Sequence, residues 1–164
     1  MCQLDAAFDT DRRKDRRIDV PFDNINERKN MGTLEEAREE FSKDLYATEL
    51  SGAVIDEIGD NYARCSMELT EKHKNAYGGI MGGAIYTLAD FAFAVASNFG
   101  KEAATVSVVG QASFMSQPKG NVLIAEARLI KDGRSNCFYD VTVTDEHDRI
   151  VAVVNFNGAH VKRK

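Results

Sequence analysis

Asp90 is the residue of this sequence that most directly suggests chemistry. It is the only acidic or basic residue between Gly82 and Asn98, in the run GGAIYTLADFAFAVASN, whose other residues are mostly apolar or small. An unpaired charge is costly to bury in an apolar interior, so such a group is usually partnered, protonated or directed into a cleft where a reaction needs it. Because no basic residue lies within one helical turn of Asp90, we favour the functional interpretation over the structural one.

Glycines are concentrated just ahead of this stretch and at its start. Asn75 is followed by Gly78, Gly79, Gly82 and Gly83. The first amides of a helix have no intrahelical partner and carry a partial positive charge, so an amide left open by a missing Cβ could hold an anion or polarise a carbonyl oxygen. The alternative is that the glycines serve only a tight turn and close packing of helix on sheet.

Helix geometry separates the two candidate groups. Eight residues between Gly82 and Asp90 correspond to roughly 12 Å along a helix axis, so one ligand carbonyl cannot touch both. If the amide and the carboxylate serve one reacting centre, the carboxylate must come from a second copy of the helix that lies antiparallel to the first. A two-fold dimer provides this with one self-complementary surface and two equivalent sites, so we expect a homodimer or a dimer of dimers.

Composition argues against several other classes of function. The 164-residue chain has a net charge of −5 and a pI near 5.3, which gives no electrostatic basis for binding nucleic acid. No C-x-x-C pair and no histidine ligand pattern occurs, which predicts reduced thiols, no metal and no cofactor. The sequence does not open with a signal-peptide pattern, and its one long apolar stretch is slightly short of a membrane span. We therefore expect a cytoplasmic protein with no membrane partner.

The hydropathy pattern predicts one α+β domain over residues 33–164, preceded by a charged and flexible arm at 1–32. Thr33 and Glu36 form a capping-box pattern that begins an amphipathic helix, expected to continue to Leu50. Two alternating runs joined at Gly59-Asp60 predict a hairpin, and the apolar helix follows. Period-two runs then predict four strands in an antiparallel meander that wraps around a helix buried on all sides; they lie at 104–115, 122–130, 137–144 and 150–161.

The run NAYGGIMGGAIYTLADFAFAVASN resembles the signature of the hotdog-fold thioesterases of the phenylacetate-degradation type. That signature is approximately N-x-x-G-x-x-H-G-G-x-x-x-x-L-x-D followed by an apolar tail, and the spacing from Asn75 through the double glycine to Asp90 is fully kept. The similarity covers about residues 41 to 162. It implies a hotdog fold, in which an antiparallel sheet wraps around a long central helix, and an acyl-CoA substrate whose thioester is hydrolysed.

The resemblance also implies roles for individual residues. The aspartate that matches Asp90 acts as general base or nucleophile, and the backbone N–H that matches Gly82 polarises the thioester carbonyl. The residues that match Asn75 and Ser107 orient the water or the substrate. Thioesters suit such a site because their carbonyl is electrophilic and their thiolate leaves readily, so neither a metal nor a Ser/His pair is required.

Met81 departs from the signature, which has histidine before the double glycine. Methionine cannot donate a hydrogen bond or change its charge, so activity could be weakened or lost. The alternative function is therefore a non-catalytic acyl-CoA binding or sensing protein that keeps the pocket. The upstream His73 is expected to be an exposed loop residue.

The remaining candidates would contact the substrate around this site. Met81, Gly83 and Tyr86 share the start of the apolar helix, although an aromatic packing role is the alternative for Tyr86. Three basic residues in strand connections could meet the phosphates of coenzyme A, and their alternative is a solvated surface; they are Lys119, Lys131 and Arg134.

Overall fold

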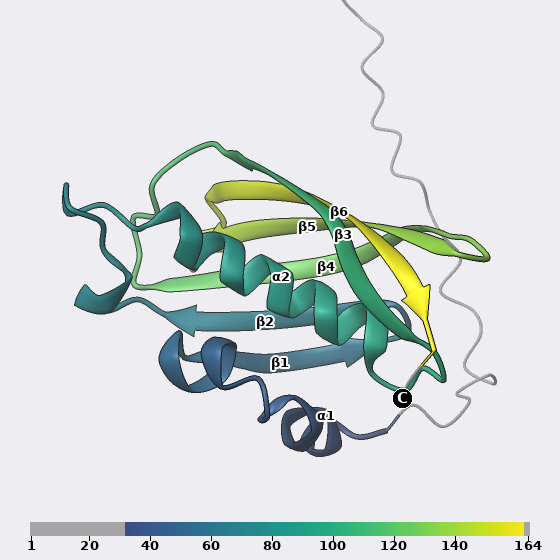
Figure 1. Ribbon diagram of the computed structural model, residues 1–164. Helices are drawn as coiled ribbons and strands as arrows, with labels where there is room; N and C mark the ends of the chain where they lie inside the picture. The colour runs from purple at the N-terminus through teal and green to yellow at the C-terminus, as the bar shows by residue number, and fades with distance from the viewer. Residues whose placement is uncertain (1–31, 163–164) are drawn as a thin grey trace, which may run out of the picture.

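A computed structural model describes residues 32–162 of the chain, as one curved sheet with a long helix lying across it (Figure 1). The helices are α1 (Leu34–Phe41) and α2 (Gly82–Asn98), with a π-helical turn η1 (Tyr46–Leu50) and a 3-10 turn η2 (Glu71–His73). The strands are β1 (Ala53–Gly59), β2 (Tyr62–Glu68), β3 (Ala104–Phe114), β4 (Val122–Asp132), β5 (Asn136–Asp145) and β6 (Ile150–Val161). The predicted arm lies outside the described residues except for Gly32. No helix of the described part is long and apolar enough to cross a membrane.

The sheet is antiparallel throughout, and its strand order is β1-β2-β4-β5-β6-β3. The predicted hairpin is confirmed, with Gly59 opposite Tyr62 and Asn61 in the left-handed region at φ 55°. The predicted meander of four strands is wrong for β3, which pairs with β6 at the edge of the sheet while β4 pairs with β2. The link after β3 begins beside β6, where the amides of Met115 and Ser116 both donate to the Val151 carbonyl. It then continues to β4, on the other side of β5 and β6 in the sheet.

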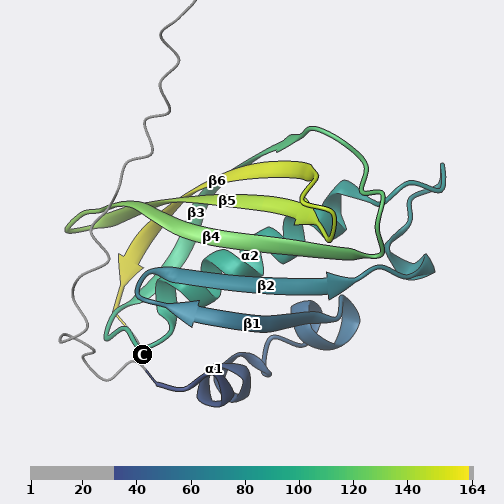
Figure 2. The same ribbon diagram turned by 180° about the vertical axis from the view of Figure 1, so that it is seen from behind.

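The predicted single helix over residues 33–50 is wrong as one continuous element, because it is interrupted between α1 and the π-helical turn η1. The capping box is present, because the Thr33 hydroxyl accepts from the Glu36 amide at 3.2 Å and the Glu36 carboxylate accepts from the Thr33 amide at 2.6 Å. However, α1 ends at Phe41, and the Asp44 carboxylate then accepts from the Ala47 amide and starts η1. Side chains with local hydrogen-bonding capacity compete with the helical backbone in this way. In Figure 2 α1 lies beside the edge strand β1.

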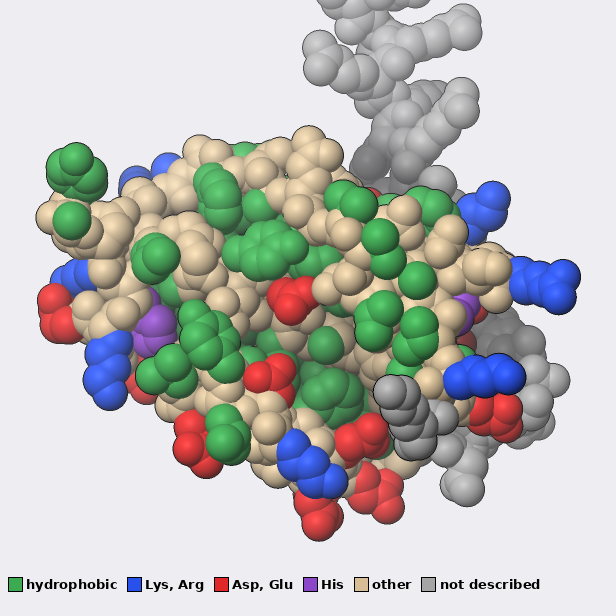
Figure 3. All heavy atoms as spheres, in the orientation of Figure 1, with side chains coloured by type: hydrophobic (Ala, Val, Ile, Leu, Met, Phe, Trp, Pro, Cys, Tyr) green, Lys and Arg blue, Asp and Glu red, His purple; other side chains and the backbone are tan. Residues whose placement is uncertain are grey.

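The sheet covers one side of α2 and leaves the other side open. Half-buried or exposed residues recur at helical spacing along the open side, at Gly83, Tyr86, Thr87, Asp90 and Ala94. The expectation of a helix buried on all sides is therefore wrong for the single chain, because one curved sheet can enclose only one face. Figure 3 shows hydrophobic side chains gathered on this face, with acidic atoms among them and the basic side chains near its margins.

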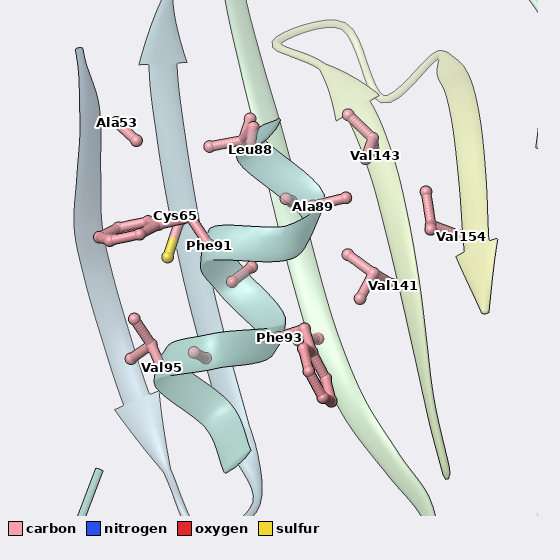
Figure 4. Packing of buried hydrophobic residues seen from close by; sticks show 14 of the residues in the cluster. Ala53, Cys65, Leu88, Ala89, Phe91, Phe93, Val95, Val141, Val143 and Val154 are labelled. Atoms are coloured by element: carbon pink, nitrogen blue, oxygen red, sulfur yellow. The ribbon is translucent and has the colours of Figure 1, made fainter. Parts of the chain in front are cut away.

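The buried side of α2 forms the core with the inner face of the sheet. Phe91 points toward β1, and Phe93 points to the other side, toward β5 (Figure 4). The Phe93 ring stacks on Phe156 of β6 with 4.7 Å between centroids and meets Tyr139 of β5 edge-on at 5.3 Å. These contacts fix the rotation of α2, and so they determine which residues remain on its open side.

Candidate functional site

Asp90 lies half-buried on the open side of α2. No described residue forms an ion pair or a hydrogen bond with its carboxylate. Burial raises the pKa of Asp90 above its ordinary value, and the negative charge of Asp44 raises it further. A carboxylate that is partly desolvated, unpartnered and still accessible is a stronger base than one in water.

The start of α2 offers backbone donors. Met81 is the N-cap residue and its side chain makes no capping hydrogen bond, and no described residue accepts from the amides of Gly82 or Gly83. A Cβ at Gly82 would lie 3.1 Å from the edge of the Phe114 ring, and one at Gly83 would lie 3.2 Å from the end of the Met81 side chain. Met81 is 54% exposed, and Gly83 beside it is exposed as well.

The loop before α2 is held from two sides. The Gln117 side chain accepts from the Ile80 amide at 2.8 Å and donates to the Ile80 carbonyl at 3.4 Å, which ties the loop to the link between β3 and β4. The His73 carbonyl accepts from the Met81 amide at 2.8 Å. These bonds determine where the first amides of α2 point.

His73 is buried, so its expected exposure is wrong. Its Nδ1 accepts from the Thr70 amide at 2.9 Å, which leaves Nε2 to donate to the Ser51 carbonyl at 3.0 Å. The imidazole is thus occupied by two backbone groups, and it positions the loop rather than reaching the carboxylate.

Two further candidates lie outside α2, one in the loop before it and one on β3. Asn75 is exposed, and its Oδ1 accepts from the amides of Tyr77 and Gly79, so the side chain shapes the loop and leaves its NH₂ group to donate elsewhere. Ser107 is exposed on β3, opposite Gly158 of β6.

Tyr86 lies near Asp90 on the open side of α2. Its ring packs on Phe156 with 5.7 Å between centroids. Burial raises the pKa of Tyr86, and the neighbouring charge of Asp90 adds to this. The hydroxyl reaches β3 at Gly110, where a Cβ would lie 1.9 Å from it. Glycine at that strand position therefore makes room for the tyrosine.

The three basic candidates are divided between the two ends of β4. Lys119 precedes the strand, and its amide donates to the buried carboxylate of Asp145 at 2.9 Å. Lys131 and Arg134 lie at the far end, roughly 30 Å away at the rise of an extended strand, so a single phosphate cannot contact both groups within one chain. Arg134 lines a cavity of about 330 Å³ that Lys101 and His160 also line, beyond the carboxyl end of α2.

Gly82 and Asp90 remain apart in the single chain. Both belong to α2, and their separation along its axis is roughly 12 Å, as predicted. No group of three or more metal-binding side chains occurs among residues 32–162. The arrangement can therefore activate water and polarise a carbonyl only if two chains combine their groups.

Sequence reasoning missed two residues that bear on this site. Asp44 lies within the amphipathic helix predicted over residues 33–50, with no predicted role, yet its charge acts on Asp90. No role is predicted for Gln117, although its side chain holds the loop before α2. Neither residue carries a local pattern that relates it to α2, although Gln117-Pro118 does mark the end of a strand.

Comparisons with known proteins agree with this fold. Residues 77–152 match the family model of the thioesterase superfamily. A protein from Archaeoglobus fulgidus, named as an esterase, is 30% identical to this chain over 120 residues. The matched region covers 73% of this chain and 78% of that protein.

Two solved structures show the same fold. The Escherichia coli PaaI protein of the phenylacetic acid degradation operon has a TM-score of 0.68 at 22% identity and covers 79% of this chain and 96% of its own. A hypothetical thioesterase from Streptococcus pneumoniae, solved with coenzyme A, has a TM-score of 0.69 at 21% identity and covers 77% of this chain and 98% of its own. The chain described here belongs to the thioesterase superfamily and has the hotdog fold.

Proposed function

We propose that this protein is an acyl-CoA thioesterase that works as a homodimer, with Asp90 of one subunit and the Gly82 amide of the other at each site. The observation that carries the proposal is the Asp90 carboxylate, half-buried on an open helix face with no cationic partner among the described residues. An unpartnered carboxylate destabilises a helix whose role is only structural. Hydrolysis, in contrast, requires an unpaired carboxylate as its general base.

The chemistry follows from these two groups. Asp90 takes a proton from water, and the water oxygen attacks the thioester carbonyl carbon. The developing oxyanion accepts from the Gly82 N–H, whose position at a helix start favours negative charge. The C–S bond then breaks, and the proton on Asp90 passes to the sulfur, which gives the free acid and CoA. A direct attack by Asp90, with a mixed anhydride that water then hydrolyses, uses the same groups.

The exposed surface of β3 supports the dimer. β3 is an edge strand, and an edge strand with apolar side chains is a template for pairing with another chain. Val106, Val108 and Val109 are 47%, 62% and 53% exposed. The open side of α2 and this edge share the near face of the molecule in Figure 1, so a two-fold partner would cover both.

The cavity that Arg134 and Lys101 line supports CoA as the carrier. The relative from S. pneumoniae was solved with coenzyme A. From Asp90 to Ser97, which also lines the cavity, the helix rises roughly 10 Å, a span that an extended pantetheine arm can bridge. The Arg134 guanidinium there would meet the phosphates, whereas the Lys101 ammonium already pairs with Asp60 at 2.8 Å.

The alternative is a non-catalytic acyl-CoA binding protein. Met81 favours it, because an exposed thioether stands at the N-cap where the resemblance predicts a histidine. The two functions differ in one measurable event, the release of free CoA thiol.

The test is a thiol-release assay over a panel of acyl-CoAs, run with wild type, Asp90→Asn and the exposed control Asp56→Asn. If Asp90 is the general base, kcat of Asp90→Asn should fall at least a hundredfold, because a general base contributes about 10²- to 10⁴-fold. Asp56→Asn should keep the activity of the wild type. Retained turnover in Asp90→Asn would overturn the proposed role. Ligand-induced thermal stabilisation of the wild type without thiol release would favour the binding protein.

Folding of Asp90→Asn can be checked in the same preparation. Because the pKa of Asp90 is raised in the folded protein, the free energy of unfolding falls as pH rises from the ordinary carboxyl pKa through the raised one. The amide variant lacks this loss, so its Tm at pH 7 should equal or exceed that of the wild type.

A further inference from the structure

Asp145 is a buried carboxylate that the proposed reaction does not use. Among residues 32–162 it is the only acidic residue whose side chain is buried, with 0% of its surface exposed. It is the last residue of β5, where the turn to β6 begins. A buried carboxylate is costly unless hydrogen bonds replace its water, so the partners of Asp145 indicate what it does.

Three backbone amides donate to this carboxylate. Two belong to the turn itself, because Oδ1 accepts from the amides of His147 at 3.0 Å and Arg149 at 3.1 Å. The third belongs to a distant segment, because Oδ2 accepts from the Lys119 amide at 2.9 Å. These bonds, and that from Lys119 above all, hold the pKa of Asp145 below its ordinary value. One oxygen therefore shapes the turn, and the other binds the segment that joins β3 to β4.

That segment, residues 115–121, is named here the β3-β4 link, and the same turn holds it at further points. The exposed Glu146 carboxylate accepts from the Asn121 amide at 2.6 Å. Near the other end of the link, the Ser116 hydroxyl accepts from Arg149 Nε at 3.0 Å. Figures 1 and 2 show the β3-β4 link, the turn between β5 and β6 and the start of α2 at the same end of the molecule.

The β3-β4 link in turn holds the loop before α2. The Gln117 side chain accepts from the Ile80 amide at 2.8 Å and donates to the Ile80 carbonyl at 3.4 Å. Gly79 leaves room for this side chain, because a Cβ there would lie 3.1 Å from Gln117 Oε1. Ile80 lies two residues before Gly82, whose N–H is the proposed oxyanion donor. A continuous series of contacts thus runs from Asp145 through Gln117 to the start of α2.

We propose that Asp145 is a positioning residue for thioester hydrolysis, because it fixes, through the β3-β4 link, where the first amides of α2 point. The inference rests on the proposed function, in which the Gly82 N–H receives the oxyanion. The Asp145 carboxylate is engaged by three backbone amides, so it acts through the backbone and not on the substrate. A misplacement of about 1 Å at a catalytic group can cost about a hundredfold in rate, so release of the link should lower kcat.

Asp145→Asn removes one acceptor and keeps the size of the side chain. The amide oxygen can still accept from the two turn amides, whereas the NH₂ group cannot accept from the Lys119 amide. We expect kcat to fall at least tenfold and KM to stay within twofold, because the contact with the oxyanion is made in the transition state and not with the bound substrate.

Asp148→Asn is the matched control for this variant. It removes the same charge from an exposed residue of the same turn, and asparagine tolerates the φ of 58° at that position. Asp148→Asn should keep kcat and KM of the wild type. A loss of kcat in Asp148→Asn as large as in Asp145→Asn would overturn the specific role of Asp145.

A double-mutant cycle separates positioning from a general loss of stability. If Asp145 and Gln117 act in series on the start of α2, either change alone releases the loop and the second change adds little. Asp145→Asn, Gln117→Ala and the double variant should then all lose kcat by a similar factor, about tenfold. Two independent structural effects would multiply to about a hundredfold in the double variant, and that outcome would refute the positioning role.

Amide hydrogen exchange tests the same contacts without turnover. The Ile80 amide is protected by its bond to Gln117, so release of the link should speed its exchange. We expect exchange at Ile80 to be at least tenfold faster in Asp145→Asn than in wild type, and unchanged in Asp148→Asn. Unchanged exchange in Asp145→Asn would overturn the proposal.

Glu146→Gln serves as a second variant if Asp145→Asn does not fold. Its exposed carboxylate accepts from the amides of both Asn121 and Val122, and glutamine can accept from only one of them through its oxygen. Exchange at Ile80 should again be faster than in wild type, and unchanged exchange would again refute the role of the turn.

The two proposals can fail separately. If Gly82→Ala loses kcat but Asp145→Asn leaves both kcat and the exchange of Ile80 unchanged, the thioesterase function stands and the positioning role is refuted. If no acyl-CoA is hydrolysed, the proposed function fails, and faster exchange of Ile80 in Asp145→Asn still supports Asp145 as the residue that positions the start of α2.

Discussion

A methyl group added at Gly82 should leave α2 intact and close off its first amide. Each Cα–Cβ bond of a helix tilts toward the helix start, so the new methyl group would project toward the oxygen that the Gly82 N–H is proposed to hold. Within the fold, the Cβ would lie 3.1 Å from Phe114 Cζ and 3.4 Å from its nearest ring neighbours. Phe114 is 54% exposed, so its ring can yield by the few tenths of an ångström required.

The magnitudes differ for folding and for catalysis. Alanine is favoured over glycine in a helix by up to about 1 kcal/mol, so the free energy of unfolding of Gly82→Ala should change by between 0 and about +1 kcal/mol, and Tm should rise by at most about 4 °C. Loss of an oxyanion donor reduces kcat by about 10²- to 10³-fold, or about 2.7–4 kcal/mol. The variant should therefore be no less stable and at least a hundredfold slower.

Gly59→Ala is the matched control. Its Cβ would also lie 3.1 Å from an aromatic side chain, that of Tyr62, but in the turn between β1 and β2. Calorimetry and thiol release on both variants measure the two effects. If Gly82→Ala folds normally and keeps kcat within threefold of wild type, the role of its amide is refuted.

Three further predictions follow from the surroundings of the site. Burial raises the pKa of Asp90, and the charge of Asp44 raises it further. Asp44→Asn should therefore move the acid limb of the pH profile of kcat/KM to lower pH. An unchanged midpoint of that limb would contradict the effect of Asp44 on Asp90. Gln117→Ala should lower the free energy of unfolding by about 1–3 kcal/mol, because the part-buried Ile80 amide loses its acceptor. An unchanged free energy of unfolding in urea would refute this prediction. Val108→Lys on β3 should sediment as a monomer and be inactive, because the dimer that forms the site is lost. The control Ile130→Lys, at a similarly exposed residue of β4, should stay dimeric and active. An active monomer would refute the dimer proposal.

The sequence predicted those parts of the fold that local signals specify. The Thr33 capping box, the hairpin at Gly59 and the apolar helix around Asp90 depend on residues close together in the chain, and each was found. The strand pairing was missed because β3 and its partner β6 are separated by two other strands, and alternation gives a strand's period without its neighbour. The early end of α1 at Phe41 depends on Asp44, which competes for backbone amides just beyond it.

The candidate site residues are proposed from the sequence, whereas the contacts that hold them in place are seen only in the fold. The spacing of Gly82 and Asp90 along one helix is a property of the sequence, and so the expectation of a second subunit follows from the sequence alone. The burial of His73 could not be foreseen, because its Nε2 bonds the carbonyl of Ser51, 22 positions earlier. The bond of Gln117 to the Ile80 backbone spans 37 positions and has the same origin. Contacts of this kind are decided by tertiary packing.

Complementation between two inactive variants tests the shared site most directly. Asp90→Asn and Gly82→Ala subunits are unfolded together, refolded as a mixture and assayed for thiol release. In a two-fold dimer with shared sites, half of the dimers are mixed, and each mixed dimer has one site with a native Asp90 and a native Gly82. The account predicts recovery of about one quarter of wild-type activity from two parents that are each nearly inactive. Activity no higher than that of the parents, in a mixture shown to contain mixed dimers, would contradict the claim that each site is built from two subunits.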